Sequence, residues 1–290
     1  MDFGATFGHN RDGFRISTIP STTRETPREK RIMNFKGKTA VITGASSGIG
    51  LGYANELAAR GANLVLVARN KQALEKIAAD IKATSNVRID VVALDLSKVT
   101  SGHELLDSLK NLKISADILI NNAGFGTNNR VAKEDRVKIQ QEILLNVVTL
   151  VDLTAAVLPE MLAKDFGAII NIGSTASFQP VPGMAVYGAT KAFVRSFTSA
   201  LWGEVRGTNV RVLTVNPGAT STEFFNVAGA KPAGKLAPVT DVISATFRAL
   251  DSKNPAPSIV VGKQNAIMAG FTRFVPTKFV ITVAAKLFLH

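Results

Sequence analysis

The sequence predicts a single α/β domain built on a doubly wound, seven-stranded parallel sheet that is flanked by helices. From Lys38 onward, short apolar runs rich in β-branched residues alternate with longer segments of helical periodicity, which is typical of a parallel sheet covered by helices. The 290 residues are 46% hydrophobic and 19% charged, so they can bury one large core. We expect strands at 39–43, 64–68, 89–94, 117–120, 168–172, 210–215 and 259–261.

Helices are expected in the gaps between these strands and near the end of the chain. Gly61 and Gly207 directly follow predicted helices, where a glycine in the left-handed conformation often ends a helix. Pro276 suits the first turn of a final helix. In such a sheet, ligands bind beyond the carboxyl ends of the strands, so we expect the functional residues there. The expected helices are 49–60, 71–84, 101–112, 134–164, 184–206 and 241–251.

The two ends of the chain differ in composition from the predicted domain. Residues 1–33 are polar and rich in Ser, Thr and Arg, and they lack the apolar stretch of a secretory signal. A mitochondrial presequence is the alternative, but four acidic residues in this stretch argue against it. We therefore expect a flexible N-terminal extension at 1–33, one α/β domain at 34–262 that carries the site, and a helical C-terminal tail at 263–290.

The charge of the chain raises the question of an anionic partner. The formal net charge is +12, and residues 252–290 contain five basic residues and no acidic one. Such an excess is typical of proteins that bind nucleic acid or a membrane face. Nucleic-acid binding would also need interleaved aromatic platforms or a known binding module, and we identify neither. We therefore expect no nucleic-acid partner.

The absence of cysteine narrows the chemistry further. It excludes a disulfide framework, thiolate metal sites and a cysteine nucleophile, and it fits a reducing compartment such as the cytoplasm. The three histidines, His9, His103 and His290, lie in separate regions without the close spacing of metal ligands. We therefore expect no metal site.

A glycine-rich turn joins the first predicted strand to the helix that follows it. Glycines let the chain turn tightly while backbone N–H groups approach a pyrophosphate, and the helix N-terminus favours an anion. The spacing Gly-xxx-Gly-x-Gly differs from the best-known dinucleotide motif, but its position at the first strand–helix junction favours a dinucleotide over an ordinary connection. The prediction is a Rossmann-type domain whose turn binds the dinucleotide through Gly44, Ser46, Ser47, Gly48, Ile49 and Gly50.

The end of the second predicted strand distinguishes NAD from NADP. NAD-selective sites place a carboxylate there for the ribose hydroxyl, whereas a 2′-phosphate needs a cation. Here the strand ends in Ala68 and Arg69 with no acid beside them, and a guanidinium forms forked hydrogen bonds to a phosphate. Ser46 can add a hydroxyl contact to the same phosphate. These residues favour NADP(H), the alternative being that Arg69 is an ordinary surface residue.

Tyr187 and Lys191 are the strongest candidates for proton transfer. They stand four positions apart in a predicted helix, so their side chains share one face. A phenol has an ordinary pKa near 10, and a neighbouring cation lowers it by favouring the phenolate. We expect Lys191 to act in this way, which would make acid–base work by Tyr187 feasible.

Three motifs together resemble the short-chain dehydrogenase/reductase family. They are the glycine-rich turn, Asn121-Asn122-Ala123-Gly124 after the fourth strand, and Tyr187-Gly-Ala-Thr-Lys191. Each is common alone, but their order and distances are specific, and the resemblance covers about 34–262. Ser174 stands thirteen residues before Tyr187, which is the usual interval in this family.

The resemblance implies an NADP(H)-dependent oxidoreductase that interconverts a carbonyl and an alcohol. Tyr187 would donate or remove the proton, and Lys191 would lower its pKa and bind the nicotinamide ribose. Ser174 would hydrogen-bond to the substrate oxygen, and Asn146 would hold a water that links Lys191 to solvent. The further implied cofactor contacts are Asp95, Leu96, Asn122, Ala123, Gly124, Pro217, Gly218, Thr220 and Thr222.

A non-catalytic function stays open as the alternative. The chain would then be an NADPH-binding regulatory or scaffold protein with little turnover, because a fold does not guarantee chemistry. A pure sensor has no need of Ser174, Tyr187 and Lys191 together, so we favour the enzyme, and we also expect a homo-oligomer.

The predicted substrate cleft and the C-terminal tail are both apolar. Segments 178–186 and 220–239 are expected to line the cleft, the second as a mobile lid that carries Phe224 and Phe225. A hydrophobic ketone, aldehyde or secondary alcohol is the expected small-molecule substrate, unless these loops merely pack on the core. In the tail, the charges between the apolar residues are all basic, which fits peripheral contact with an anionic membrane, a dimer contact or a flap over the pocket.

Overall fold

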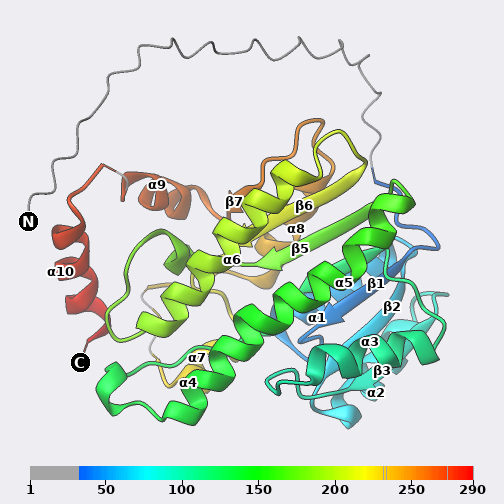
Figure 1. Cartoon of the computed structure of the whole chain (residues 1–290), viewed down its shortest axis with the longest axis horizontal. Helices are drawn as coiled ribbons and strands as arrows, with labels where there is room; N and C mark the ends of the chain where they lie inside the picture. The colour runs from blue at the N-terminus through cyan, green and yellow to red at the C-terminus, as the bar shows by residue number, and fades with distance from the viewer. Residues whose placement is uncertain (1–32, 231, 233, 273, 290) are drawn as a thin grey trace, which may run out of the picture. The chain divides into compact units, whose positions relative to one another are not determined.

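Seven parallel strands form one sheet in the order β3-β2-β1-β4-β5-β6-β7, which confirms the predicted fold class (Figure 1). The computed structural model describes residues 33–230, 232, 234–272 and 274–289. Apart from Met33, the expected N-terminal extension lies outside these residues. The strands are β1 Thr39–Thr43, β2 Asn63–Ala68, β3 Ile89–Ala93, β4 Ile118–Asn121, β5 Gly167–Ile172, β6 Val210–Asn216 and β7 Ser258–Val260.

Helices connect these strands, and α1, α2, α3, α6 and α8 were predicted to within two residues at each end. The short helix α7, inside the predicted lid, was not foreseen. The helices are α1 Gly48–Ala59, α2 Lys71–Lys82, α3 Ser101–Asn111, α4 Arg136–Ile143, α5 Leu150–Ala163, α6 Ala185–Glu204, α7 Phe224–Ala228, α8 Val239–Leu250, α9 Lys263–Phe271 and α10 Thr277–Phe288. Shorter turns are the 3-10 segments η1 Val131–Lys133 and η3 Thr175–Phe178 and the π-helical η2 Leu144–Thr149.

The core lies in two layers because successive strand residues point to opposite faces of the sheet. On β1, Ile42 packs with α1, α2 and α8, whereas its neighbour Val41 packs with α3, α5 and α6. Burial on both faces explains why the central strands β1, β2, β4 and β5 are mainly apolar instead of alternating with polar residues. The edge strands β3 and β7 are partly exposed. With both faces covered, the carboxyl ends of the strands remain as the place where polar side chains gather.

The expected uninterrupted helix at 134–164 is wrong in one respect. The segment is helical from Arg136 to Ala163, but six residues in its middle adopt the wider π-helical turn η2. By length and composition this run would suffice to cross a membrane, yet its side chains Leu153 and Met161 are buried against the sheet. π-Helical turns are rare and are frequent at functional sites, and this one carries Asn146.

Two helices, α9 and α10, form the C-terminal tail. α9 begins after Gly262, whose φ of 89° lies in the region that favours glycine. α10 begins directly after Pro276, which occupies the position before the first turn and not within it. The hydroxyl of Thr272, just after α9, is shared between the carbonyl oxygens of Ala269 (2.9 Å) and Phe178 (3.2 Å). The bond to Phe178 ties the tail to the end of η3.

Candidate active site

A cavity of about 650 Å³ opens at the carboxyl ends of the strands. Every predicted site residue lines it except Gly50 and Asn146, which lie just behind its wall. The residues come from the turns after β1, β2, β3, β4, β5 and β6 and from α6, so the fold brings together positions that are up to 178 residues apart, from Gly44 to Thr222. This is the location expected for a ligand in a doubly wound sheet.

The glycine-rich turn forms one end of the cavity and leaves no room for side chains at its three glycines. Gly44 and Gly48 have φ values of 65° and 52°, and a Cβ on Gly44 would lie 2.7 Å from the Asn122 Nδ2 atom. A Cβ on Gly50 would collide with the carbonyl oxygen of Gly44. Gly50 therefore shapes the turn without lining the cavity, and the bare backbone can approach a pyrophosphate closely.

Asn122 holds this turn in place from the neighbouring strand. Its Nδ2 atom donates to the carbonyl oxygens of Thr43 (2.9 Å) and Gly44 (3.1 Å). In return, the backbone N–H groups of Asn122 and Ala123 both donate to the Thr43 hydroxyl over 3.0 Å. The motif after β4 thus fixes the shape of the turn after β1.

Arg69 and Asp95 lie in the same end of the cavity, after β2 and β3. Arg69 is exposed, and its guanidinium is free to meet a ligand from solvent. Asp95 accepts hydrogen bonds from the backbone N–H (3.1 Å) and hydroxyl (2.7 Å) of Ser97. Burial raises the pKa of Asp95, but the bonds from Ser97 and the charges of Arg69 and Lys98 hold it below its ordinary value. The Asp95 carboxylate is therefore held by its own loop.

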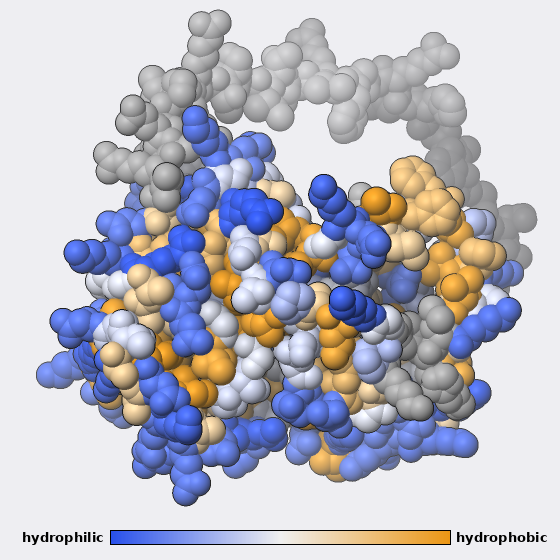
Figure 2. Space-filling model, turned by 180° about the vertical axis from the view of Figure 1, so that it is seen from behind, coloured by the Kyte–Doolittle hydropathy of each residue, from blue (hydrophilic) through white to orange (hydrophobic). Residues whose placement is uncertain are grey.

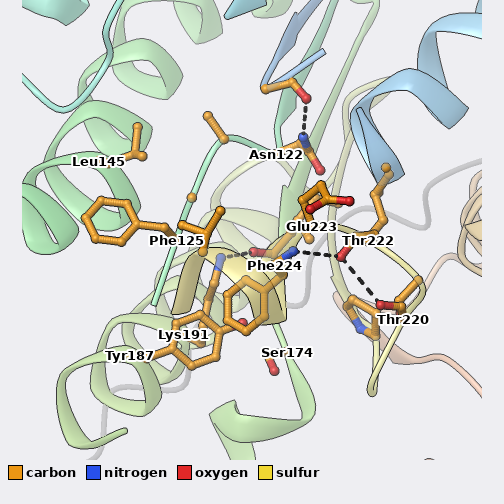
Figure 3. A pocket seen from close by; sticks show the side chains of 18 of the residues that line it. Asn122, Phe125, Leu145, Ser174, Tyr187, Lys191, Thr220, Thr222, Glu223 and Phe224 are labelled. Atoms are coloured by element: carbon orange, nitrogen blue, oxygen red, sulfur yellow. Dashed lines mark hydrogen bonds between the residues drawn. The ribbon is translucent and has the colours of Figure 1, made fainter. Parts of the chain in front are cut away.

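Tyr187, Lys191 and Ser174 converge at the other end of the cavity (Figure 3). The Lys191 Nζ atom lies 5.8 Å from the centroid of the Tyr187 ring, one turn away on α6. It donates to the carbonyl oxygen of Ile172 at the end of β5 over 2.7 Å. Ser174, at the start of η3, forms a side-chain hydrogen bond with Tyr187. A phenol, a hydroxyl and a buried ammonium therefore face one space.

The pKa of Tyr187 differs from the expectation that Lys191 would lower it. Burial raises the pKa of Tyr187 to about 12, although the bond with Ser174 lowers it. Burial also lowers the pKa of Lys191 to about 8. At neutral pH, Tyr187 is thus a phenol and Lys191 is mostly protonated. A protonated phenol in this place is suited to donating a proton to a reacting oxygen.

Asn146 does not line the cavity and acts as a brace behind it. Its Nδ2 atom donates to the carbonyl oxygen of Phe125 (2.9 Å) and to the hydroxyl of Thr190 (3.1 Å), while its Oδ1 atom accepts from the Phe125 N–H (3.2 Å). A Cβ placed on Gly124 would lie 2.8 Å from Asn146 Oδ1 and 3.5 Å from Lys191 Nζ. Asn146 therefore joins the segment after β4 to α6 beside the lysine.

Glu142 is a buried charged residue near the site that the sequence interpretation missed. It lies on α4, one turn before Asn146, and is 0% exposed. Its Oε2 atom accepts from the N–H (3.1 Å) and hydroxyl (2.7 Å) of Thr127, while its Oε1 atom has no partner among the described residues. Burial raises the pKa of Glu142, and its charge raises the pKa values of Lys191 and Tyr187. The only signal in the sequence is a glutamate four positions before Asn146.

Apolar side chains from the two predicted cleft segments surround Tyr187. The ring of Phe224 lies 5.0 Å from the Tyr187 ring, centroid to centroid, and Val181 and Met184 pack beside it. Asn265 on α9 also lines the cavity, a contribution from the tail that no motif indicated. The reacting end of the cavity is thus apolar around one phenol.

Comparisons with known proteins agree with this geometry. Residues 38–233 match the short chain dehydrogenase family. The chain is 38% identical over 193 residues to the NADP-dependent 3-hydroxy acid dehydrogenase of Schizosaccharomyces pombe, covering 65% of this chain and 73% of that one. It is 35% identical over 215 residues to the very-long-chain 3-oxoacyl-CoA reductase of Homo sapiens, covering 72% and 67%.

A solved structure extends the similarity to the fold. The short-chain dehydrogenase from Sphingobium yanoikuyae in complex with NADPH has a TM-score of 0.72 and 33% identity, covering 82% of this chain and 96% of that one. Nicotinamide cofactors are therefore found in the same fold at this level of similarity. The chain belongs to the short-chain dehydrogenase/reductase family and is an oxidoreductase that acts on alcohol or carbonyl groups.

Proposed function

We propose that this protein is an NADPH-dependent reductase of hydrophobic ketones or aldehydes, which also runs the reverse oxidation of secondary alcohols. The observation that carries the proposal is the convergence of Ser174, Tyr187 and Lys191 in an apolar cavity. The glycine-rich turn and Arg69 at the opposite end fit a dinucleotide with a 2′-phosphate. The relative from S. pombe is named as NADP-dependent, which supports the same preference.

The proposed division of labour follows from the positions of the side chains. When bound, the nicotinamide supplies the hydride to the carbonyl carbon. Tyr187 then gives its phenolic proton to the developing alkoxide oxygen, while Ser174 donates a hydrogen bond to that oxygen. Lys191, held by Ile172, stabilises the phenolate that remains. Asn146 keeps the segment after β4 against α6, so that this geometry is maintained.

The proposed activity is tested with a panel of carbonyl compounds, by following the loss of NADPH absorbance at about 340 nm. The panel pairs aliphatic ketones, aldehydes and 3-oxo esters of short and long chain. We expect kcat/KM to rise with chain length, because the cavity around Tyr187 is apolar. Tight NADPH binding without turnover of any member would favour the regulatory alternative instead.

The position of Glu142 leads to a prediction about the pH dependence of reduction. Burial lowers the pKa of Lys191 to about 8, and the Glu142 charge opposes that effect. Replacing Glu142 by Gln removes the charge that opposes the effect of burial on the pKa of Lys191. The pKa of Lys191 therefore falls further, and the lysine loses its proton at lower pH. We expect the alkaline limb of the kcat/KM profile to move down by about one pH unit, with little change well below the limb.

The matched control is Glu134→Gln, which removes the same charge from a less buried neighbour whose field acts on Glu142. It is expected to leave the limb where it is, since losing the Glu134 charge does not raise the pKa of Glu142 and so does not remove the Glu142 charge. Thr127→Val removes a hydrogen bond that lowers the pKa of Glu142, so it is expected to shift the limb in the same direction as Glu142→Gln. Identical profiles for all three variants and the parent would contradict this role of Glu142.

We also propose that the protein is a cytoplasmic homo-oligomer. Exposed apolar side chains on the outer faces of the helices from α4 to α6 support self-association, because such residues are costly to leave in water. They are Val137, Ile143, Val148, Leu162 and Phe193.

A further inference from the structure

The tail carries an exposed apolar region, here called the C-terminal surface. Seven of the fifteen exposed large hydrophobic side chains among the described residues fall between positions 267 and 283, and Phe274 is 86% exposed. Figure 2 shows apolar side chains gathered at the right-hand edge, where α9 and α10 lie. A concentration of this kind marks an interaction surface rather than ordinary surface composition. The C-terminal surface consists of Ile267, Met268, Phe271, Phe274, Phe279, Ile281 and Val283.

The charged residues within the tail itself all have one sign. No acidic residue occurs from 252 to 290, and Lys263, Lys278 and Lys286 are exposed beside the apolar side chains. Apolar side chains mixed with lysines are typical of helices that lie in the interface of an anionic bilayer. A second copy of the chain fits less well, because a symmetric contact would bring these lysines toward their own counterparts.

The same helices border the active-site cavity. Asn265 on α9 lines the cavity, and Thr272 is bonded to Phe178 at the end of η3, next to the cleft. Figure 1 shows α9 and α10 on the side of the sheet toward which the strands point. A ligand that reaches the cavity past the tail would therefore pass close to whatever the C-terminal surface contacts.

We propose that the C-terminal surface docks this protein on an anionic lipid bilayer, and that its substrates are lipophilic carbonyl compounds dissolved in that bilayer. The docking follows from the exposed apolar residues and the one-signed charge. The substrate class rests in addition on the proposed reductase function. Docking beside the cavity gives a poorly soluble ketone a short path from lipid to Tyr187 and spares it the aqueous phase.

The docking is tested by co-sedimentation of the full chain with vesicles of phosphatidylcholine alone and with vesicles in which about a third of the lipid is phosphatidylserine. We expect at least about tenfold more bound protein on the anionic vesicles, and loss of most of it at high salt. The triple variant Phe271→Ser, Phe274→Ser, Phe279→Ser and the double variant Lys278→Glu, Lys286→Glu are both expected to reduce binding about tenfold or more.

Matched controls change the same chemistry elsewhere on the surface. Val99→Ser and Val131→Ser remove exposed apolar side chains far from the tail in sequence, and Lys82→Glu with Lys110→Glu reverses two exposed charges on α2 and α3. These variants are expected to bind as the parent does. Equal binding by parent and tail variants overturns the docking. The docking is also overturned if the parent does not bind vesicles and the tail variants only change the protein from dimer to monomer in light scattering.

The substrate class has a separate readout. Turnover of a long-chain ketone incorporated in anionic vesicles is expected to fall about tenfold in the triple Phe variant, while turnover of a short water-soluble ketone stays the same. Tyr187→Phe is expected to bind vesicles like the parent. Vesicle binding without any carbonyl turnover would therefore refute the reductase function and keep the docking, whereas turnover without vesicle binding would refute the docking alone.

Discussion

Replacing Tyr187 by Phe is expected to lower carbonyl turnover by about a thousandfold while NADPH binding stays within about threefold of the parent. The phenol holds its proton at neutral pH, because burial raises its pKa to about 12. It can therefore serve as the donor that we propose for the developing alkoxide. Phenylalanine keeps the ring and its contact with Phe224, so the cavity retains its shape and loses only the proton.

The measurement is single-turnover reduction together with NADPH titration by fluorescence. The chain contains two tyrosines, and the other one provides the control. Tyr53 is buried, and its hydroxyl hydrogen-bonds to Thr246 over 2.6 Å, away from the cavity. Tyr53→Phe is expected to cost about 1 kcal/mol of stability and to leave turnover unchanged. If the Tyr187→Phe variant kept full turnover, Tyr187 would be excluded as the proton donor.

Arg69→Asp is expected to change the ratio of kcat/KM for NADPH over NADH by about a hundredfold in favour of NADH. The new carboxylate would repel a 2′-phosphate and could accept a hydrogen bond from the ribose hydroxyl of NADH. Asp95 follows the next strand, β3, and its Oδ1 atom already accepts two hydrogen bonds from Ser97. The expected change therefore comes from one exposed side chain at the end of β2.

Steady-state kinetics with both cofactors at fixed ionic strength measure this ratio. Lys82→Asp makes the same change of charge at the far end of α2 and is expected to leave the ratio unaltered. If Arg69→Asp and Lys82→Asp gave the same ratio as the parent, the phosphate would have to be bound elsewhere in the cavity.

The layered fold was predictable because the central strands are buried on both faces. Val41 and Ile42 point to opposite layers, so no polar residue interrupts the run, and a continuous apolar segment indicates a central strand. The interruption of the long helix by η2 was not predictable in the same way. It depends on the bonds of Asn146 to Phe125 and Thr190, which are remote in sequence.

Much of the candidate site was also open to prediction, for a different reason. Lys191 and Tyr187 are one helical turn apart, and the glycine-rich turn is a contiguous segment, so local spacing is enough to recognise them. The functional roles of these residues stay predictions until the variants are measured. The structure adds that all but Gly50 and Asn146 line one cavity.

By itself, the sequence determined the order of strands and helices, the glycine-rich turn and the pairing of Tyr187 with Lys191, because these depend on periodicity and short spacing. Only the tertiary structure decided how charges act in the site. Packing buries Tyr187 and Lys191, which raises the pKa of Tyr187 and lowers the pKa of Lys191. It also places Glu142 close enough for its charge to raise both pKa values. The effective charge of a side chain depends on what surrounds it, and those surroundings come from distant parts of the chain.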